Sequence, residues 1–438
     1  MVLYLFTLLI AICCSKICLF PLFSLSLRAD YIYVYREVEL RKWFFVVWML
    51  LFTCCRVVAQ QLSDSLRVGL LTCSPGDEVY QLYGHTALRV RDLRGNQDFV
   101  FNYGVFDFNT PHFTWRFVLG KCDYEVMAYP FDLFLEEYRR RGSSVVEQTL
   151  ALTDEEAQRL VRNLAVNALP ENKTYRYNFL LNNCTTKARD MVEQAIDGHV
   201  VYAESEEHPT YRQLLHRYTQ RHPWAEEGND LLLGAACDTV LSDRAMQFLP
   251  ELLMGYFAEA QIYDTLENRR PLVAETTELL PLVERPLAAA QGDVWDTLTP
   301  GYVSCLAILV TLAIMLVEFK LRRMLWGVDI VLMVLQGLAG LLLCFMFLFS
   351  QHPTMDSNWQ VWLLNPLPLV CLPWVVRCAI KRKKCLYHYV NLFVLALFVV
   401  FMLWIPQQFS ALTLTLALVL LARPISYLVH YSLYSKSR

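Results

Sequence analysis

Five long apolar runs in the last third of the chain constrain its fold more than any other feature. They occupy about residues 302–319, 325–349, 360–376, 386–404 and 408–429. Each run is near the length that a helix needs to cross a bilayer. Over the whole chain 55% of the residues are hydrophobic, which excludes a single soluble domain. We therefore expect an all-α transmembrane domain of five helices over residues 300–438.

The loops between these runs alternate in charge. The basic ones contain Lys320, Arg322, Arg323, Arg377 and residues 381–384, and Arg423, Lys436 and Arg438 lie toward the end. The loops at residues 350–360 and 405–410 contain no Lys or Arg. Cytoplasmic loops carry an excess of these residues. The alternation therefore predicts a cytoplasmic C-terminus, with the region before Pro300 outside.

Residues 1–59 are predicted to be an N-terminal extension with a signal peptide. The apolar stretch 43–55 is short for a membrane span, and Val57-Val58-Ala59 is typical of a cleavage site. In this interpretation translation starts beyond Met1. The alternative is that residues 3–27 form a real first span. The choice does not alter the expected function, and export by a signal peptide agrees with the loop charges.

Between the extension and the spans, residues 60–299 are predicted to fold as an α+β domain. Strand patterns cover residues 66–71, 85–90 and 99–103, and helical patterns cover about 154–168 and 185–196. The first helix has a capping-box signature, because Thr153 is followed three residues later by Glu156. Gly198 ends the second helix. Mixed strands and helices of this kind form one layered globular unit.

Charge and cysteine usage exclude several classes of function. The net charge of −3 gives no basic field for nucleic acid, so we expect no nucleic-acid partner. Of the fourteen cysteines, Cys73, Cys122, Cys184 and Cys237 fall in the polar middle of the chain. They have no metal-binding spacing, and we expect neither metal nor cofactor. We interpret the three besides Cys184 as small buried residues, with a disulfide as the alternative.

Cys184 lies in the segment Asn-Asn-Cys-Thr-Thr, directly before a helical pattern. Asn182 or Asn183 is a good N-cap, which places the thiol in the first helical turn. There the helix dipole and the unpaired amides favour the thiolate, and the same amides can stabilise an oxyanion. Cys184 is therefore a candidate nucleophile, and Asn183 a candidate accessory residue. Taken alone, a buried structural cysteine is the alternative.

His85 begins an apolar strand in the segment Tyr-Gly-His-Thr-Ala-Leu, and small neighbours leave its ring room. Paired with Cys184, it would act as general base and then as general acid. Asn102 is the expected third residue, because residues 99–103 should lie beside the His85 strand. Asp107 is the second candidate for that role. Tyr83 or Tyr103 could donate to an oxyanion, although packing is the alternative for both tyrosines.

An outer loop at residues 350–359 should lie on the same side of the membrane as the α+β domain. Trp359 ends this loop and Trp362 lies just beyond it, and both suit a membrane interface. His352 and Asn358 are candidate contacts for lipid head groups, with an ordinary loop as the alternative.

A histidine strand followed about 100 residues later by an Asn-Cys helix start resembles the circularly permuted papain-like enzymes. These include the lecithin–retinol acyltransferase type and the NlpC-like hydrolases. The fuller set of motifs resembles the Lnb family of Bacteroidetes, whose members join a periplasmic domain to a C-terminal multi-span domain. The motifs occupy residues 83–87, 101–108, 170–172, 175–179 and 182–186. This resemblance covers nearly everything from about Asp64 onward.

The resemblance implies a lipoprotein N-acyltransferase of the bacterial inner membrane, with its catalytic domain in the periplasm. Such an enzyme moves an acyl chain from a phospholipid to the α-amine of a diacylglyceryl-cysteine lipoprotein. It implies that His85 and Cys184 carry the chemistry, whereas Asn102 is assigned from the expected strand pairing. Two other functions stay open, an NlpC-type cell-wall peptidase or amidase and a non-enzymatic periplasmic membrane scaffold.

Overall fold

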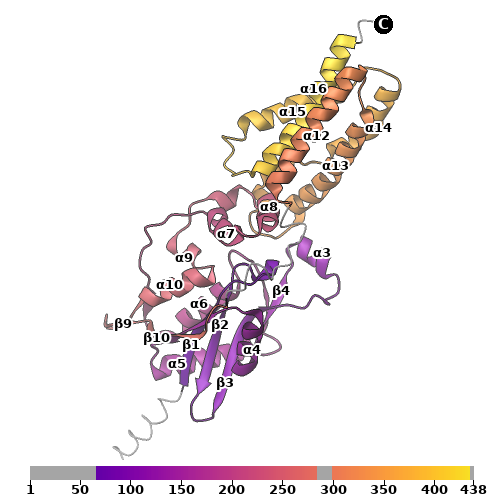
Figure 1. The fold of residues 1–438 in the computed structure, drawn as a ribbon. Coiled ribbons are helices and arrows are strands. Elements are labelled where there is room, and N and C mark those ends of the chain that lie inside the picture. The colour runs from indigo at the N-terminus through magenta and orange to yellow at the C-terminus, as the bar shows by residue number, and fades with distance from the viewer. Residues whose placement is uncertain (1–65, 284–297, 435–438) are drawn as a thin grey trace, which may run out of the picture. The chain divides into compact units, whose positions relative to one another are not determined.

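The computed structural model describes residues 66–283 and 298–434. The two interpretations of residues 1–59, as signal peptide or first span, concern residues outside these ranges, as does the basic end at Lys436 and Arg438. The described residues form a mixed α/β region followed by a helical region (Figure 1).

A seven-stranded antiparallel sheet organises the α/β region, in the order β10-β5-β1-β2-β3-β4-β6. Its strands are β1 (Leu66–Cys73), β2 (His85–Asp92), β3 (Gln97–Val105), β4 (Asp123–Pro130), β5 (Val145–Leu150), β6 (Thr174–Arg176) and β10 (Val273–Leu280). A small second sheet contains β7 (His199–Val201), β8 (Gln261–Tyr263) and β9 (Arg269–Pro271). The three predicted strands are confirmed, and each extends past its predicted end.

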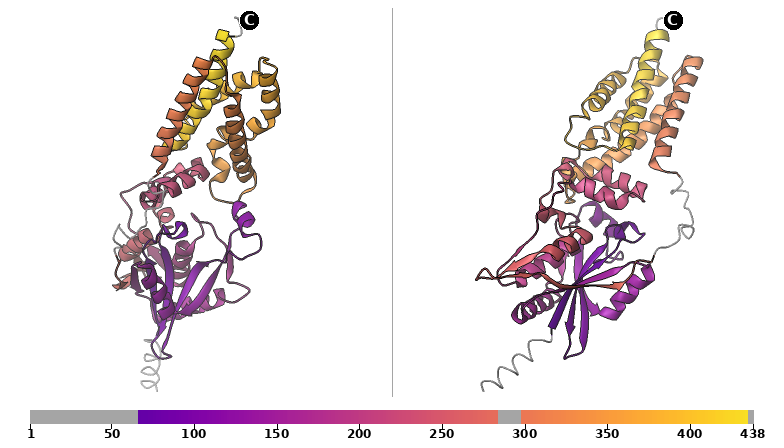
Figure 2. Two further views of the ribbon diagram at one scale, coloured as in Figure 1. Left: turned by 45° about the vertical axis from the view of Figure 1, so that its right-hand side comes forward. Right: turned by 60° about the vertical axis from the view of Figure 1, so that its left-hand side comes forward.

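Helices cover both faces of the large sheet (Figure 2). The helices of this region are α3 (Phe113–Val118), α4 (Phe131–Arg141), α5 (Asp154–Asn167), α6 (Cys184–Ala195), α7 (Tyr211–Thr219), α8 (Pro223–Leu232), α9 (Asp243–Met246) and α10 (Pro250–Glu259), with short 3₁₀ turns at Val79–Gln81 and Ala235–Asp238. The predicted capping box of α5 is confirmed, because the Thr153 side chain and the Glu156 side chain each bond the other's backbone amide.

Alternation along the central strands explains the layers. Successive side chains of a strand point to opposite faces of its sheet. Leu70 and Leu88 therefore pack on the face covered by α5, α6 and α10. Their neighbours Leu71 and Ala87 pack on the other face, against Phe134 of α4. Because both faces are buried, the register of β1 and β2 is fixed, and with it the position of His85.

The helical region contains α12 (Pro300–Leu321), α13 (Trp326–Phe349), α14 (Leu367–Ile380), α15 (Leu386–Phe401) and α16 (Ala411–Tyr434). Among the described residues, four helices are long and apolar enough to cross a membrane, with the third taken over Trp359–Ile380. The fourth predicted run forms α15, which has 16 residues and ends before the run does. Pro406 follows shortly, and a proline disfavours helix in the residue before it.

Three charged side chains are buried together among these helices. Arg423 of α16 donates from Nη2 to Glu318 Oε1 of α12 at 2.8 Å, and from Nε to Asp329 Oδ1 of α13 at 2.9 Å. The Ser426 hydroxyl donates to Glu318 Oε2 at 2.6 Å. Charges inside a membrane are costly unless they are paired, so this cluster ties α12, α13 and α16 together.

The segment 350–365, between α13 and α14, contacts the α/β region through buried amides. Gln360 Nε2 donates to the backbone oxygen of Asp230 at 2.6 Å, and Asn358 Nδ2 donates to that of Leu231 at 2.8 Å. Asn358 is only 1% exposed, and its Oδ1 accepts from the Gln360 amide. The expectation that Asn358 contacts lipid head groups is therefore wrong, because its amide joins the two regions instead.

Candidate active site

Strand pairing brings His85 and Asn102 together. Asn102 of β3 pairs with Ala87 of β2, two residues from His85, so both side chains lie on the same face. His85 Nε2 is hydrogen-bonded to Asn102 Oδ1. Asn102 Nδ2 donates to the Tyr129 hydroxyl at 2.9 Å, which fixes the amide with its oxygen toward the imidazole. His85 then donates from Nε2, which leaves its Nδ1 to exchange a proton with the Cys184 thiol.

Cys184 is the first residue of α6, and Asn183 caps the helix. Asn183 Oδ1 accepts from the amides of Thr185 and Thr186, at 3.0 and 2.9 Å. Asn183 Nδ2 donates to the backbone oxygens of Phe179 and Phe248. The Asn183 side chain thus holds the helix start in place. The thiol lies in the first turn, where a helix has amides without intrahelical acceptors.

The thiol and the imidazole stabilise each other as an ion pair. Burial opposes ionisation of Cys184, but the charge and hydrogen bond of His85 outweigh it and lower the pKa of the thiol to about 7. The amide of Thr86 and the hydroxyl of Thr185 also favour the thiolate. Burial opposes the charged imidazole too, but the Cys184 thiolate raises the pKa of His85. A thiolate beside an imidazolium is the reactive form of a cysteine nucleophile.

A glycine leaves space in front of the thiol. β3 has a bulge between Asn102 and Val105, and within it Gly104 adopts a φ of +86°. A Cβ at Gly104 would lie 3.7 Å from the Cβ of Cys184. A side chain there would be strained and would crowd the approach to the sulfur.

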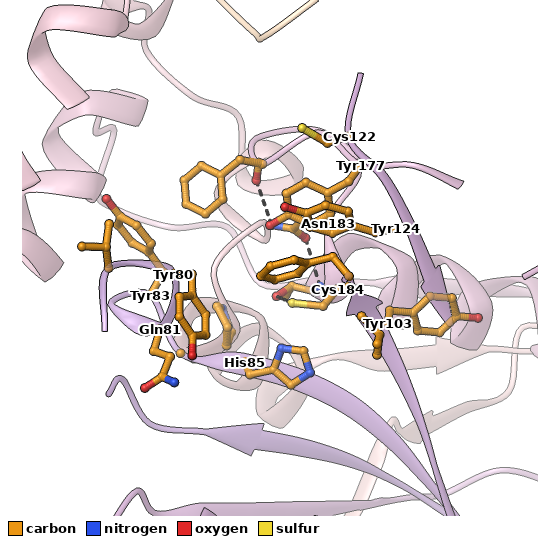
Figure 3. A pocket seen from close by; sticks show the side chains of 18 of the residues that line it. Tyr80, Gln81, Tyr83, His85, Tyr103, Cys122, Tyr124, Tyr177, Asn183 and Cys184 are labelled. Atoms are coloured by element: carbon orange, nitrogen blue, oxygen red, sulfur yellow. Dashed lines mark hydrogen bonds between the residues drawn. The ribbon is translucent and has the colours of Figure 1, made fainter. Parts of the chain in front are cut away.

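The remaining predicted residues lie in different places. The Tyr103 hydroxyl donates to Asn167 Oδ1 at 2.7 Å, and Figure 3 shows its ring directed away from Cys184. Tyr103 is therefore a core residue, and the expectation that it donates to an oxyanion is wrong. Asp107 is exposed and accepts from Asn109, whereas Asn102 is the residue bonded to His85.

Tyr83 and His352 both line the cavity at the site. The Tyr83 hydroxyl accepts from Asn229 Nδ2 at 2.6 Å, and its ring packs on Phe179 with centroids 4.8 Å apart. His352 Nε2 is bonded to the backbone oxygen of Phe117 at 2.6 Å, so this ring braces the cavity wall. Burial lowers the pKa of His352 and so favours the neutral ring.

A cavity of about 910 Å³ lies in front of Cys184 and His85 (Figure 3). Its wall is largely aromatic and includes Tyr80, Phe106, Phe113, Phe117, Tyr124, Tyr177 and Phe179. No sequence motif assigns these residues or Tyr129 to the site, although the density of phenylalanine over residues 106–117 is a signal. Among the described residues, no group of three His, Cys, Asp or Glu side chains could hold a metal ion.

Alkylation of Cys184 is expected to become faster as the pH rises through about 7, because iodoacetamide reacts with the thiolate. In His85→Ala the inflection should move up toward 9.0, the ordinary value for the thiol. Rates are measured by mass spectrometry of the Cys184 peptide across a pH series. His199→Ala, on β7, is the control. Identical profiles in wild type and His85→Ala would contradict the ion pair.

The other described cysteines of the α/β region do not interfere with this measurement. Cys73, Cys122 and Cys237 are unpaired and buried. Burial raises the pKa of each of these thiols. They should therefore react slowly across the same pH range.

Comparison with known protein families gives two matches. Residues 58–217 match the Lnb N-terminal periplasmic domain, and residues 292–436 match the Lnb transmembrane domain. The first range contains His85, Asn102 and Cys184. Neither the curated proteins nor the solved structures contain a match to this chain. The chain therefore belongs to the Lnb family and is an inner-membrane protein with a periplasmic N-terminal region followed by a transmembrane domain.

Proposed function

We propose that this protein is a lipoprotein N-acyltransferase with a permuted papain-like catalytic domain over residues 60–299. One observation carries the proposal. A buried Cys184–His85 pair, oriented through Asn102, opens into a largely aromatic cavity that reaches residues of the membrane helix α13. The donor is a phospholipid, and the acceptor is the α-amine of a diacylglyceryl-cysteine lipoprotein. Family membership supports a role in lipoprotein processing.

The residues present can run a two-step transfer. The Cys184 thiolate attacks the ester carbonyl of the donor, and the backbone amide of Cys184, which the Asn183 cap does not engage, stabilises the oxyanion. As the acyl C–O bond breaks, the His85 imidazolium protonates the leaving alkoxide, which departs as a lysophospholipid. The acceptor amine then attacks the thioester and gives its proton to His85. The C–S bond breaks, an amide forms, and the thiolate is restored.

The membrane domain keeps the catalytic domain close to its lipid-anchored substrates. Both substrates are anchored in lipid, and attachment of the catalytic domain to the same membrane raises their effective concentration at Cys184. The apolar wall keeps water away from the thioester, which would otherwise hydrolyse. A cell-wall peptidase would act on a polymer that is not dissolved in the bilayer and has no comparable use for these helices.

The membrane topology is part of the proposal. We infer five spans, with residues 350–360 and 405–410 in the periplasm and residues 320–324, 377–385 and 430–438 in the cytoplasm. Within residues 298–434, four helices have the length for this, and α15 at 16 residues crosses as the shorter fifth. The contact between segment 350–365 and the periplasmic region supports the outer location of that loop.

A cysteine introduced at Lys383 is expected to resist an impermeant thiol reagent in intact cells, because positive loops stay in the cytoplasm. It should react after the cells are permeabilised. A cysteine at Gln408, in an outer loop, is the matched position that should react in both conditions. Labelling at Lys383 in intact cells would overturn the five-span arrangement.

Incubation of the purified protein with phospholipid alone is expected to produce a burst of lysophospholipid and one hydroxylamine-labile acyl group on Cys184. A diacylglyceryl-peptide with a free α-amine should then discharge this group into an amide. A peptide with a blocked amine should leave the thioester in place. Intact-protein mass spectrometry and lipid analysis follow both steps.

Three outcomes distinguish the proposed functions. Normal turnover without an acyl-enzyme would indicate direct transfer and contradict the thioester. Cleavage of peptidoglycan peptides without lysolipid release would favour the peptidase. Full biological function in a Cys184→Ala strain would favour a scaffold.

A further inference from the structure

One wall of the cavity is a continuous row of aromatic rings. It is built from the segment between β3 and β4, which includes α3, together with one tyrosine of β4 and one that follows β6. Phe106 stacks on Tyr124 with centroids 4.8 Å apart, and Tyr124 stacks on Tyr177 at 4.3 Å. Phe113 contacts Phe106 at 6.1 Å and Phe117 at 6.3 Å. We call Phe106, Phe113, Phe117, Tyr124 and Tyr177 the aromatic wall.

The aromatic wall is joined to the end of α13 that faces the periplasmic region. Gln351 donates from its backbone amide to the Leu119 oxygen at 2.9 Å, next to the bond between His352 and Phe117. Gly120, with a φ of +66°, passes so close that a Cβ there would lie 2.4 Å from the amide nitrogen of His352. The segment that carries the wall therefore packs directly against the residues that follow α13, and a residue larger than glycine would not fit at position 120.

The far end of the cavity is apolar and belongs partly to the membrane domain. Met346 of α13 lines it within a membrane-spanning helix, and Met355 lines it from the loop beyond. Leu232 and Leu233, at the end of α8, line the same cavity. Methionine and leucine side chains offer an adaptable apolar surface with no group that requires water.

The charged side chains that line the cavity lie on α4, whose residue Tyr138 stacks on His85. Glu137 and Arg141 are bonded to each other there. At the α13 end, the polar ring of His352 is already bonded to backbone. The polarity of the cavity lining thus decreases from the catalytic end at Cys184 to the apolar end at Met346. Its 910 Å³ lies at the upper end of the roughly 300–1,000 Å³ of small-molecule sites.

From this gradient we propose that the cavity holds one acyl chain of the donor phospholipid, with its ester at Cys184 and its methyl end at Met346. The inference rests on the proposed function and adds a location and a length limit for the acyl chain. An extended chain lies along the aromatic wall, with its methyl end toward α13, and presents its carbonyl to the thiolate. The site thereby measures chain length, because Met346 and Leu232 close its far end.

The test is a competition between two donors. Purified enzyme in detergent receives an equal mixture of dilauroyl and distearoyl phosphatidylethanolamine, and intact-protein mass spectrometry gives the ratio of the two acyl groups on Cys184. Met346→Trp fills the far end and should shift the ratio toward lauroyl by about tenfold or more. Leu232→Trp, at a position already 38% exposed, should shift it in the same direction and is the second variant should Met346→Trp misfold.

Leu348→Trp is the matched control, because Leu348 lies on the same helix, is 68% exposed and does not line the cavity. It should keep the wild-type ratio. If wild type becomes acylated but neither cavity variant changes the ratio, the acyl-chain site is overturned while the transferase survives. An equal shift in Leu348→Trp would also overturn it. If wild type gains no acyl group from either lipid, the proposed function fails instead.

Discussion

Replacing Cys184 with serine is expected to abolish acylation of lipoprotein N-termini while the protein stays folded. The hydroxyl has nearly the shape of the thiol, and serine is well tolerated at a helix start, so α6 and its Asn183 cap should persist. A hydroxyl does not ionise near neutral pH as the paired thiol does. The rate should fall on the order of 10⁶-fold, as when a serine protease loses its nucleophile. The measurement is mass spectrometry of a reporter lipoprotein.

Two further variants should lower the acylation rate by smaller amounts. His85→Ala should fall nearly as far, because it removes both the base and the charge that stabilises the thiolate. Asn102→Ala should lose about 10²-fold, since the imidazole stays but is no longer oriented. Asp107→Ala is the control and should keep wild-type activity. Near-normal acylation in Cys184→Ser would refute the nucleophile assignment.

Replacing Arg423 with leucine is expected to destabilise the membrane domain severely. Glu318 and Asp329 would keep their negative charges, buried in the helical bundle with no cation bonded to them. Breaking a buried ion pair on one side costs about 3–5 kcal/mol. Much of the folded yield in detergent should be lost, as measured by size-exclusion chromatography and thermal unfolding.

A triple variant tests whether the loss of stability comes from unpaired charges or from lost packing. Adding Glu318→Gln and Asp329→Asn to Arg423→Leu removes the uncompensated charges and should recover most of the yield. Arg377→Leu, at an exposed position on α14, is the control. An Arg423→Leu protein as stable as this control would show that the cluster does not hold the bundle together.

The elements that could be predicted from sequence are those set by local rules. The capping residues Thr153 and Asn183 signal their helices because an N-cap is defined within four residues. The strand of His85 could be found because alternation needs only one segment. The pairing of Asn102 with His85 followed from two adjacent strands. Alternation also excludes Tyr103 from the face of Asn102, because adjacent residues of a strand point to opposite faces.

The features that could not be predicted depend on contacts across the chain. The Asn358 amide looks like an exposed loop residue, and only its bond to Leu231, 127 positions away, reveals that it is buried. The cavity is closed by segments from α3, α8 and α13, which no local pattern relates. Tyr129 orients Asn102 across a strand pair, and neither residue type signals that role.

The ion cluster has a consequence for the order in which this protein is made. Its two carboxylates belong to the first two helices of the membrane domain, whereas their cation arrives with the last. While the ribosome is still synthesising α14 and α15, Glu318 and Asp329 have no Arg423 to pair with. Until α16 emerges, solvation or protonation of these carboxylates must offset the cost of placing them among apolar helices. A chain that stops before Arg423 would keep that cost, so truncation within α16 should impair the first two membrane helices as well as the last.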